Sequence, residues 1–438
     1  MANILFLIDF EQGHVLSTMA LSKTLAARGH SILYAGLADA RETVTSQGFA
    51  FRPIMEDLFP AGSLTRIPEA PASSQRSSPR GRPRDDGSLF ERHPAFARAE
   101  GACFSRCVNG TLFDPIVHDF QPHIAVALSY YYLEGLVIQL RYGLPVLSFT
   151  PHLRTASRRE EVSSVIDGLM NSSVGLPEFL GLLRDCGVTV RSMNDIVGLL
   201  LQSPEFIALP RSFEDPRISQ DSLVYYIGAG VDMRRREASR PWRELANGRA
   251  LVYCSLGSQC ALKREESAGL FRAVLQAFAM RPDWFLVLST GGALGADALG
   301  PIPSNVRVFD WVPQMDVLTS ASVMINHGGI GTVKECILSR VPMVVFPLMR
   351  DQFDCADRVT RLGLGVSSSM EDASPEVVQA IIARVLGSDE IRGNIDRMAS
   401  AFLDEDSLSV AAAVVEEWAA RRGGRRTSRL TVSVNQPD

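Results

Sequence analysis

The chain has 438 residues, which exceeds one ordinary hydrophobic core and suits two domains of roughly 200 residues each. Hydrophobic residues make up 46% and charged residues 21% of the chain, as in globular proteins, and the net charge of −5 provides no basic surface for nucleic acid. The longest apolar stretch, residues 124–140, is interrupted by Glu134 and by a Ser-Tyr-Tyr-Tyr run, so we predict no transmembrane helix.

The first half of the chain alternates short apolar runs with segments of helical periodicity, which predicts a parallel sheet covered by helices. Gly29 ends the first helix and so completes a β-α-β unit with the strand that follows. The expected elements are strands at residues 4–8, 31–35, 124–128 and 145–149, helices at 16–28 and 133–141, and a mostly helical stretch at 155–210.

One segment of the first half breaks this alternation. Residues 68–86 are rich in proline, serine and arginine, and they bury too little apolar surface to offset the entropy of ordering them. We therefore predict a mobile loop at about residues 60–100; a loop that closes over a substrate is the alternative.

A second series of strands and helices follows the glycine-containing, charged segment 228–241, which we predict to be a linker. The expected elements are strands at residues 250–255, 284–288, 306–309, 323–326 and 343–346 and helices at 265–280 and 332–338. The predicted fold class is therefore α/β, with two Rossmann-like β/α/β domains facing a central cleft. The predicted boundaries are an N-terminal domain at residues 1–230, a C-terminal domain at 231–420 and a disordered tail at 421–438.

The cysteines and the first residues bear on the cellular compartment. The seven cysteines are scattered without a Cys-x-x-Cys pair, as expected in a reducing environment. The chain runs directly into an apolar strand without a basic region, so no signal peptide is predicted. We expect a cytoplasmic protein. The sequence leaves the oligomeric state open, with a homodimer among the alternatives.

Polar and glycine residues gather directly after several of the predicted strands. Because the carboxyl ends of parallel strands meet at one edge of a sheet, these residues are expected to lie together, where α/β proteins bind their ligands. The segments are residues 9–14, 255–258, 311–314, 327–332 and 348–352.

The segment from His327 to Thr332 is the most specific of these. Its three glycines allow close approach of a ligand, and the helix that follows opens with unpaired N–H groups and a positive dipole end. Together with the His327 ring and the Thr332 hydroxyl, this turn predicts a diphosphate site, and Glu335 one turn later can accept the hydroxyl pair of a ribose. The structural alternative is a capping box formed by Thr332 and Glu335.

Two other nucleotide motifs are not favoured, since the first strand is followed by one glycine rather than Gly-x-Gly-x-x-Gly and no strand is followed by a P-loop. His14 lies between a strand and a helix, where it is either a general base for an acceptor hydroxyl or a structural residue. His118, His123 and His152 show no metal-ligand spacing and are predicted to be surface or core residues.

These motifs together resemble the nucleotide-sugar glycosyltransferases of the GT-B fold, in particular the group of UDP-glycosyltransferases and bacterial natural-product glycosyltransferases. The resemblance is carried by residues 311–352, WVPQMDVLTSASVMINHGGIGTVKECILSRVPMVVFPLMRDQ. A weaker match is GHVLSTMALSKTLAARGH at residues 13–30, and the architecture is similar over residues 1–420.

The resemblance implies a role for each matching residue. The nucleotide base and ribose would be held by Trp311, Val312, Gln314 and Glu335. The diphosphate would be held by Ser258, His327, Gly329, Gly331 and Thr332, and the sugar hydroxyls by Asp351 and Gln352. His14 would be the catalytic base that activates the acceptor.

The chain departs from the family pattern in one place. The family's histidine is usually supported by an aspartate after a strand of the first half, and here that place falls near Leu128 or Ser129. A carboxylate orients an imidazole and stabilises its charged form. Either Asp9, Glu11 or Glu134 substitutes for it, or the acceptor needs little activation.

The predicted function is inverting transfer of a sugar from a UDP- or TDP-sugar to a hydroxyl or amine of a small natural-product acceptor, as in antibiotic biosynthesis. The expected partners are therefore a nucleotide sugar and a small-molecule acceptor, with no metal and no cofactor. The alternatives are a nucleotide-sugar epimerase or hydrolase and a non-catalytic accessory protein of the same fold.

Overall fold

The computed structural model describes residues 1–63, 104–172, 176–218, 221–233, 235, 238–257, 260–292, 294–403 and 407–421. These residues form two compact units. The first unit contains the described residues up to Asp232 together with the last helix, and the second contains those from Met233 to residue 403. Most of the predicted loop at residues 60–100 and all but the first residue of the predicted tail at 421–438 lie outside the described residues.

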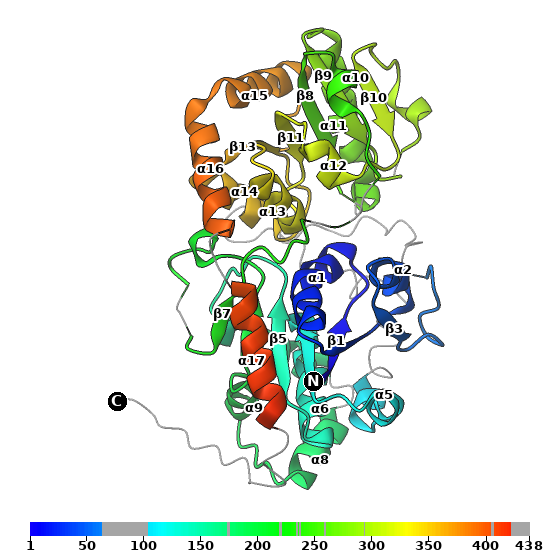
Figure 1. Ribbon diagram of the computed structural model, residues 1–438, viewed down its shortest axis with the longest axis vertical. Helices are drawn as coiled ribbons and strands as arrows, with labels where there is room; N and C mark the ends of the chain where they lie inside the picture. Colours follow the sequence, from blue (N-terminus) through cyan, green and yellow to red (C-terminus); the bar gives the residue numbers. More distant parts are fainter. Residues whose placement is uncertain are drawn as a thin grey trace. The chain divides into compact units, whose positions relative to one another are not determined.

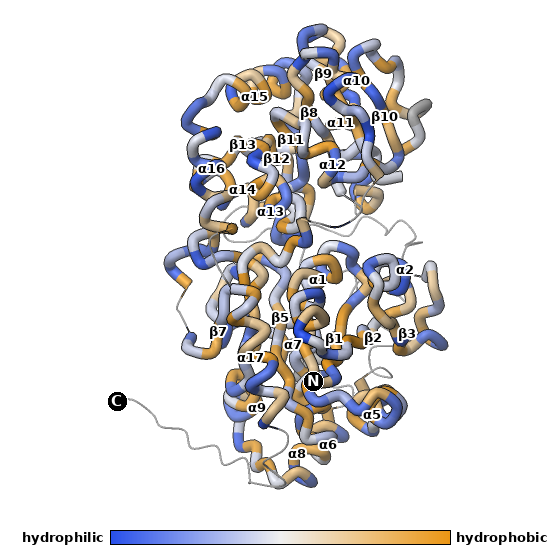
Figure 2. The backbone as a smooth tube through the Cα atoms, in the orientation of Figure 1, coloured by the Kyte–Doolittle hydropathy of each residue, from blue (hydrophilic) through white to orange (hydrophobic). Residues whose placement is uncertain are grey.

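The first unit is built on a seven-stranded parallel sheet in the order β3-β2-β1-β4-β5-β6-β7 (Figure 1). Its strands are β1 (Asn3–Ile8), β2 (Ser31–Gly36), β3 (Ala50–Pro53), β4 (Ile124–Leu128), β5 (Val146–Thr150), β6 (Glu205–Ile207) and β7 (Val224–Tyr226). The inner strands β1, β4 and β5 are almost continuously apolar and buried, because helices cover both faces of the sheet (Figure 2). Strand order reverses between β1 and β4, and such switch points are where ligands bind.

Two hydrophobic clusters cover the faces of this sheet. One lies beneath α1 (Gln12–Ala27) and α17 (Ser407–Arg421), and the other beneath α6 (Tyr132–Tyr142) and its neighbours. The remaining helices of the unit are α2 (Arg41–Thr45), α5 (Asp114–Phe120), α7 (Arg158–Ser172), α8 (Leu176–Asp185) and α9 (Met193–Leu200). Helix α1 begins at Gln12 rather than at the predicted residue 16, so His14 lies in its first turn.

The last helix corrects the predicted C-terminal domain, whose bounds were residues 231–420. Helix α17 belongs to the first unit. Ala411, Ala412 and Val415 are fully buried in the same cluster as Ile4 and Val126 of the sheet. The Glu416 carboxylate also accepts from Arg28 and pairs with His30 at 3.0 Å. The apolar stripe of α17 is readable from the sequence, whereas the core that it completes is not.

The second unit has a six-stranded parallel sheet in the order β10-β9-β8-β11-β12-β13 (Figure 1). Its strands are β8 (Ala250–Ser255), β9 (Trp284–Ser289), β10 (Val306–Phe309), β11 (Val323–Asn326), β12 (Met343–Val345) and β13 (Gly365–Ser367). Its helices are α10 (Trp242–Ala246), α11 (Arg264–Ala279), α12 (Gln314–Leu318), α13 (Ile330–Leu338), α14 (Gln352–Arg361), α15 (Pro375–Gly387) and α16 (Asp389–Leu403). The reversal of strand order here lies between β8 and β11.

Across the described residues, no helix combines the length and the apolar character needed to cross a membrane.

Candidate functional site

The turn between β11 and α13 carries the central residues of the predicted donor site. Gly329 is the N-cap of α13, and no side chain of the described residues caps that helix. The alternative of a capping box is wrong, because Thr332 is the third residue of the helix rather than its cap. A Cβ added at Gly331 would meet no atom within 4 Å, so this glycine is not required by packing. The first turn of α13 therefore offers an open backbone surface to an anion.

His327 lies partly buried just after the end of β11. Burial lowers the pKa of its imidazole to about 4, so the ring is neutral at pH 7. A Cβ on Gly257, whose φ is +76°, would lie 2.7 Å from the ring, and a Cβ on Gly329 would also collide with it. The glycines at positions 257 and 329 are thus needed to accommodate the histidine.

Two buried polar atoms at this turn lack a hydrogen-bond partner among the described residues. They are Nδ1 of His327 and Nδ2 of Asn326, the last residue of β11. Buried polar groups in native proteins are rarely left unsatisfied, and such groups at a strand end fit a polar ligand. The oxygen of Asn326 is already used, since it accepts from the backbone N–H of Gly328 at 2.8 Å.

Glu335, Gln314 and Thr332 lie together in the second unit. The Gln314 amide donates to Glu335 Oε2 at 2.6 Å and to Thr332 Oγ1 at 3.4 Å. The other Glu335 oxygen accepts from Arg235 at 2.6 Å, so both carboxylate oxygens are engaged. This fixes the carboxylate, which the sequence associates with a ribose, in one orientation.

Trp311 and Val312 differ sharply in exposure. The Trp311 side chain is 56% exposed, which leaves its ring face available for stacking on a planar base. Val312 is 3% exposed, so the whole residue is buried.

The last two predicted donor residues follow β12. Asp351 is the N-cap of α14 and comes directly after Arg350, whose φ is +53°. Gln352 is buried, and its side-chain oxygen accepts from the backbone N–H groups of Leu348 and Met349 at 2.9 and 3.1 Å. The side-chain oxygen of Gln352 therefore stabilises the turn between β12 and α14. β12 pairs with β11, so these residues lie at the strand end next to His327. Ser258, the remaining predicted donor residue, lies outside the described residues.

In the first unit, the predicted base has a carboxylate partner. His14 Nδ1 lies 2.6 Å from Oδ2 of Asp9, the residue that follows β1 and is 1% exposed. The other Asp9 oxygen accepts from the backbone N–H of Glu11 at 3.1 Å. Glu11 Oε2 lies 3.5 Å from Nε2 of His14. Of the three carboxylates expected as substitutes for the aspartate, Asp9 makes the shortest contact with His14, and Glu134 lies within α6.

Two aromatic residues not predicted for the site also lie here. The Tyr130 ring stacks on His14 with centroids 5.1 Å apart and an interplanar angle of 30°. Its hydroxyl lies 3.1 Å from Nδ1 of His152, which follows β5. His152, predicted to be a surface or core residue, is partly buried and lies in contact with Tyr130. The tyrosine run at the end of β4 is the sequence signal that could have identified Tyr130.

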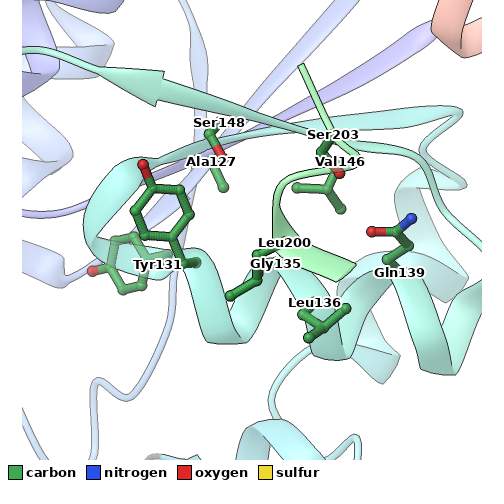
Figure 3. A pocket seen from close by; sticks show the side chains of 10 residues that line it. Ala127, Tyr131, Gly135, Leu136, Gln139, Val146, Ser148, Leu200 and Ser203 are labelled. Atoms are coloured by element: carbon green, nitrogen blue, oxygen red, sulfur yellow. The ribbon is translucent and has the colours of Figure 1, made fainter. Parts of the chain in front are cut away.

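A small pocket lies elsewhere in the first unit, between α6 and the strands β4 and β5 (Figure 3). Its lining mixes apolar side chains with the polar groups of Tyr131, Gln139 and Ser148. Neither His14 nor Tyr130 lines it. It is therefore separate from the base described above.

Buried ion pairs anchor the helical insertion next to that pocket. Arg158, at the start of α7, donates to the carbonyl of Ser203 at 2.6 Å and lies 2.9 Å from the Glu205 carboxylate. Arg154 donates to both oxygens of Glu214 at 2.6 and 2.9 Å, with both side chains fully buried. These contacts tie α7 and α9 to the sheet and give the network a structural role.

The C-terminal part of the chain matches a protein-family model. The model is described as "Erythromycin biosynthesis protein CIII-like, C-terminal domain" and matches residues 287–417. Over 426 residues the chain is 28% identical to demethyllactenocin mycarosyltransferase of Streptomyces fradiae, covering 95% of this chain and 86% of the relative. It is 25% identical over 412 residues to oleandomycin glycosyltransferase of Streptomyces antibioticus, covering 92% and 88%.

Solved structures share the whole architecture. The glycosyltransferase of kitacinnamycin matches with a TM-score of 0.71 and 22% identity, covering 95% of this chain and 99% of that chain. The glycosyltransferase VinC in complex with dTDP matches with a TM-score of 0.66 and 18% identity, covering 96% and 100%.

The two parallel sheets and these likenesses define the class of the protein: it has the GT-B fold and is a glycosyltransferase. Within that class its sequence is similar to those of bacterial natural-product glycosyltransferases, in agreement with the resemblance at residues 311–352.

Proposed function

We propose that the chain transfers a sugar, with inversion at the anomeric carbon, from a dTDP- or UDP-sugar to a hydroxyl or amine of a small natural-product acceptor. The observation that carries the catalytic part of this proposal is the pair formed by His14 and Asp9, 2.6 Å apart at the carboxyl end of β1. A neutral imidazole held by a carboxylate at one nitrogen presents the other nitrogen as a proton acceptor.

The acceptor step follows from this pair. His14 Nε2 takes the proton of the acceptor hydroxyl while the oxygen attacks the anomeric carbon. The new carbon–oxygen bond forms as the bond from that carbon to the diphosphate breaks, and the nucleoside diphosphate leaves with the electron pair. Attack opposite the leaving group inverts the configuration. Asp9 stabilises the imidazolium that results.

On the donor side, the diphosphate is placed at the turn between β11 and α13. The neutral His327 ring, the first N–H groups of α13 and the Thr332 hydroxyl supply hydrogen bonds and the helix supplies a positive dipole end. Ser258 is assigned to the same phosphates. These groups take the negative charge without a metal or a cofactor.

The remaining donor residues recognise the rest of the nucleotide sugar. Trp311 stacks on the base, and the exposure of its ring supports this role. Glu335, oriented by Gln314, accepts from the ribose. Asp351 and the amide of Gln352 bind sugar hydroxyls. The dTDP bound to VinC supports a thymidine nucleotide as the first donor to test.

Product analysis tests the proposal. The full chain is incubated with dTDP- and UDP-sugars, with and without a panel of polyketide acceptors, and products are identified by mass spectrometry and by the NMR coupling constant at the anomeric proton. Inverted glycoside that requires acceptor is expected. Retained configuration would overturn the mechanism. Epimer or free sugar formed from donor alone would favour an epimerase or hydrolase, and failure to bind either nucleotide would favour an accessory protein.

A further inference from the structure

The end of β4 carries an aromatic residue next to Leu128 and Ser129, where the family resemblance led us to expect a carboxylate that supports the base. β4 ends at Leu128, and Tyr130 follows within a short 3-10 turn (Ser129–Tyr131). Since Leu7 of β1 pairs with Ala127 of β4, the ends of these two strands are adjacent. The ring of Tyr130 consequently reaches His14 and stacks on it, with centroids 5.1 Å apart.

Tyr130 is itself held in position by His152. The distance from its hydroxyl to His152 Nδ1 is 3.1 Å, and the two ring centroids lie 5.4 Å apart. His152 follows β5, whose Phe149 pairs with Leu128 of β4. The residues that carry the three rings follow three neighbouring strands, β1, β4 and β5. The rings of residues 14, 130 and 152 therefore form a row at the edge of the sheet.

The stacking of Tyr130 on His14 acts together with the contact between His14 and Asp9. Asp9 binds His14 at Nδ1, in the plane of the imidazole, and Tyr130 covers a face of the same ring. The face of an aromatic ring carries negative charge and attracts a cation placed over it. When His14 accepts a proton, both neighbours therefore favour the charged ring. Glu11, 3.5 Å from Nε2, is a further negative group facing it.

We propose that Tyr130 is a positioning residue for His14: its ring, fixed by His152, stabilises the imidazolium and holds the ring plane. The inference rests on the proposed function, in which His14 is the base. The end of β4 thereby supplies an aromatic face, while the carboxylate comes from the end of β1.

Substitution at Tyr130 separates the ring from the hydroxyl. Tyr130→Leu removes the stacked ring, so kcat is expected to fall about 2- to 30-fold, the range of a cation–π contact, with little change in the KM for acceptor. Tyr130→Phe keeps the ring but loses the bond to His152, so a smaller fall is expected. His152→Gln is expected to resemble Tyr130→Phe. His118→Gln, at a histidine whose side chain is 88% exposed, is the matched control and is expected to leave kcat unchanged.

The decisive measurement is the titration of His14 by NMR in the full chain, assigned with His14→Ala. Because the ring favours the charged imidazole, Tyr130→Leu is expected to lower the pKa of His14, and Tyr130→Phe to lower it less. In the His14→Ala background, Tyr130→Leu is expected to cause no further loss of kcat. Thermal melting establishes that each variant is folded. If Tyr130→Leu does not fold, the same measurements on Tyr130→Phe and His152→Gln test the inference.

The outcomes are separable. An unchanged pKa of His14 in both Tyr130 variants, a loss confined to the KM for acceptor, or a full additional loss in the His14→Ala background would each overturn the inference. The NMR titration of His14 does not require the protein to transfer sugar. A shifted pKa in a chain that transfers no sugar would therefore support the role of the ring and count against the proposed function alone.

Discussion

At the scale of single residues, the proposed base and its carboxylate partner come from one short segment. Asp9 and His14 are five positions apart in the chain, and their contact of 2.6 Å depends on the turn from β1 into α1. The sequence placed the start of that helix at residue 16, whereas α1 begins at Gln12. The earlier start puts His14 in the first helical turn, within reach of Asp9.

Removal of the Asp9 carboxylate is expected to impair the chemical step. Asp9→Asn keeps the shape of the side chain but favours the wrong tautomer of His14, so kcat should fall on the order of a hundredfold or more. Binding of dTDP, measured by calorimetry, should be unchanged. Asp119→Asn, at an aspartate that is exposed and paired with Arg52, is the control. Full activity of Asp9→Asn would show that this carboxylate is not the partner of the base.

His327 is expected to make the stability of the second unit depend on pH. Its folded pKa of about 4 lies below its ordinary value of 6.5, so the unfolded chain binds a proton in a range where the folded chain does not. The contribution of His327 to the free energy of unfolding is therefore fully present above pH 6.5. It decreases by about 3 kcal/mol as the pH falls toward 4. Denaturant unfolding at pH 7 and pH 4.5 measures this loss. His327→Gln should show a smaller loss over the same interval, and an equal loss would contradict the assignment.

At the scale of elements, helix α17 shows that a local hydrophobic pattern predicts a helix without indicating which sheet the helix packs against. The buried positions Ala411, Val415 and Ala419 mark its apolar face. That face completes a cluster with β1 and β4, strands near the other end of the sequence. Hydrophobic periodicity identifies the helix and the face that it buries, but carries no information about which of two sheets receives it.

A charge on the buried face of α17 is expected to destabilise the first unit. Val415 is fully buried, so Val415→Asp should cost about 3 kcal/mol through an unpaired carboxylate. Val410, on the same helix, is 52% exposed, and Val410→Asp is the control. Hydrogen exchange should show lost protection in β1 and β4 with β8 and β11 unaffected. Loss of protection in β8 and β11 instead would place the helix with the second unit.

At the scale of the whole molecule, the predictable parts are those whose signals are local. Each strand predicted from the sequence is present within one residue of its expected bounds, because the inner strands are continuously apolar. The strands that were not predicted, β3, β6, β7 and β13, are only three or four residues long and too weakly patterned to be recognised in the sequence. The donor block could be predicted from the sequence because its residues follow one another in the chain. The contact of Tyr130 with His14 could not be predicted, because it depends on the adjacency of β1 and β4.

The whole enzyme is expected to work without a divalent metal. His327, Thr332 and the start of α13 provide the donors for the diphosphate on the proposed reading. Addition of EDTA should leave both turnover and the affinity for dTDP unchanged, as measured by product formation and by calorimetry. A control with added Mg²⁺ should also give the same turnover. Activity that disappears in EDTA and returns with Mg²⁺ would refute this part of the mechanism.

The packing of helix α17 in the first unit has a consequence for folding during translation. Domains generally fold as they leave the ribosome, N-terminal domain first. Here the first 232 residues emerge without the helix that covers part of the β1 and β4 face, because α17 lies at residues 407–421. The second unit is complete by residue 403 and can fold before the first unit receives its last helix. The first unit is therefore completed by a helix that is synthesised only after the second unit.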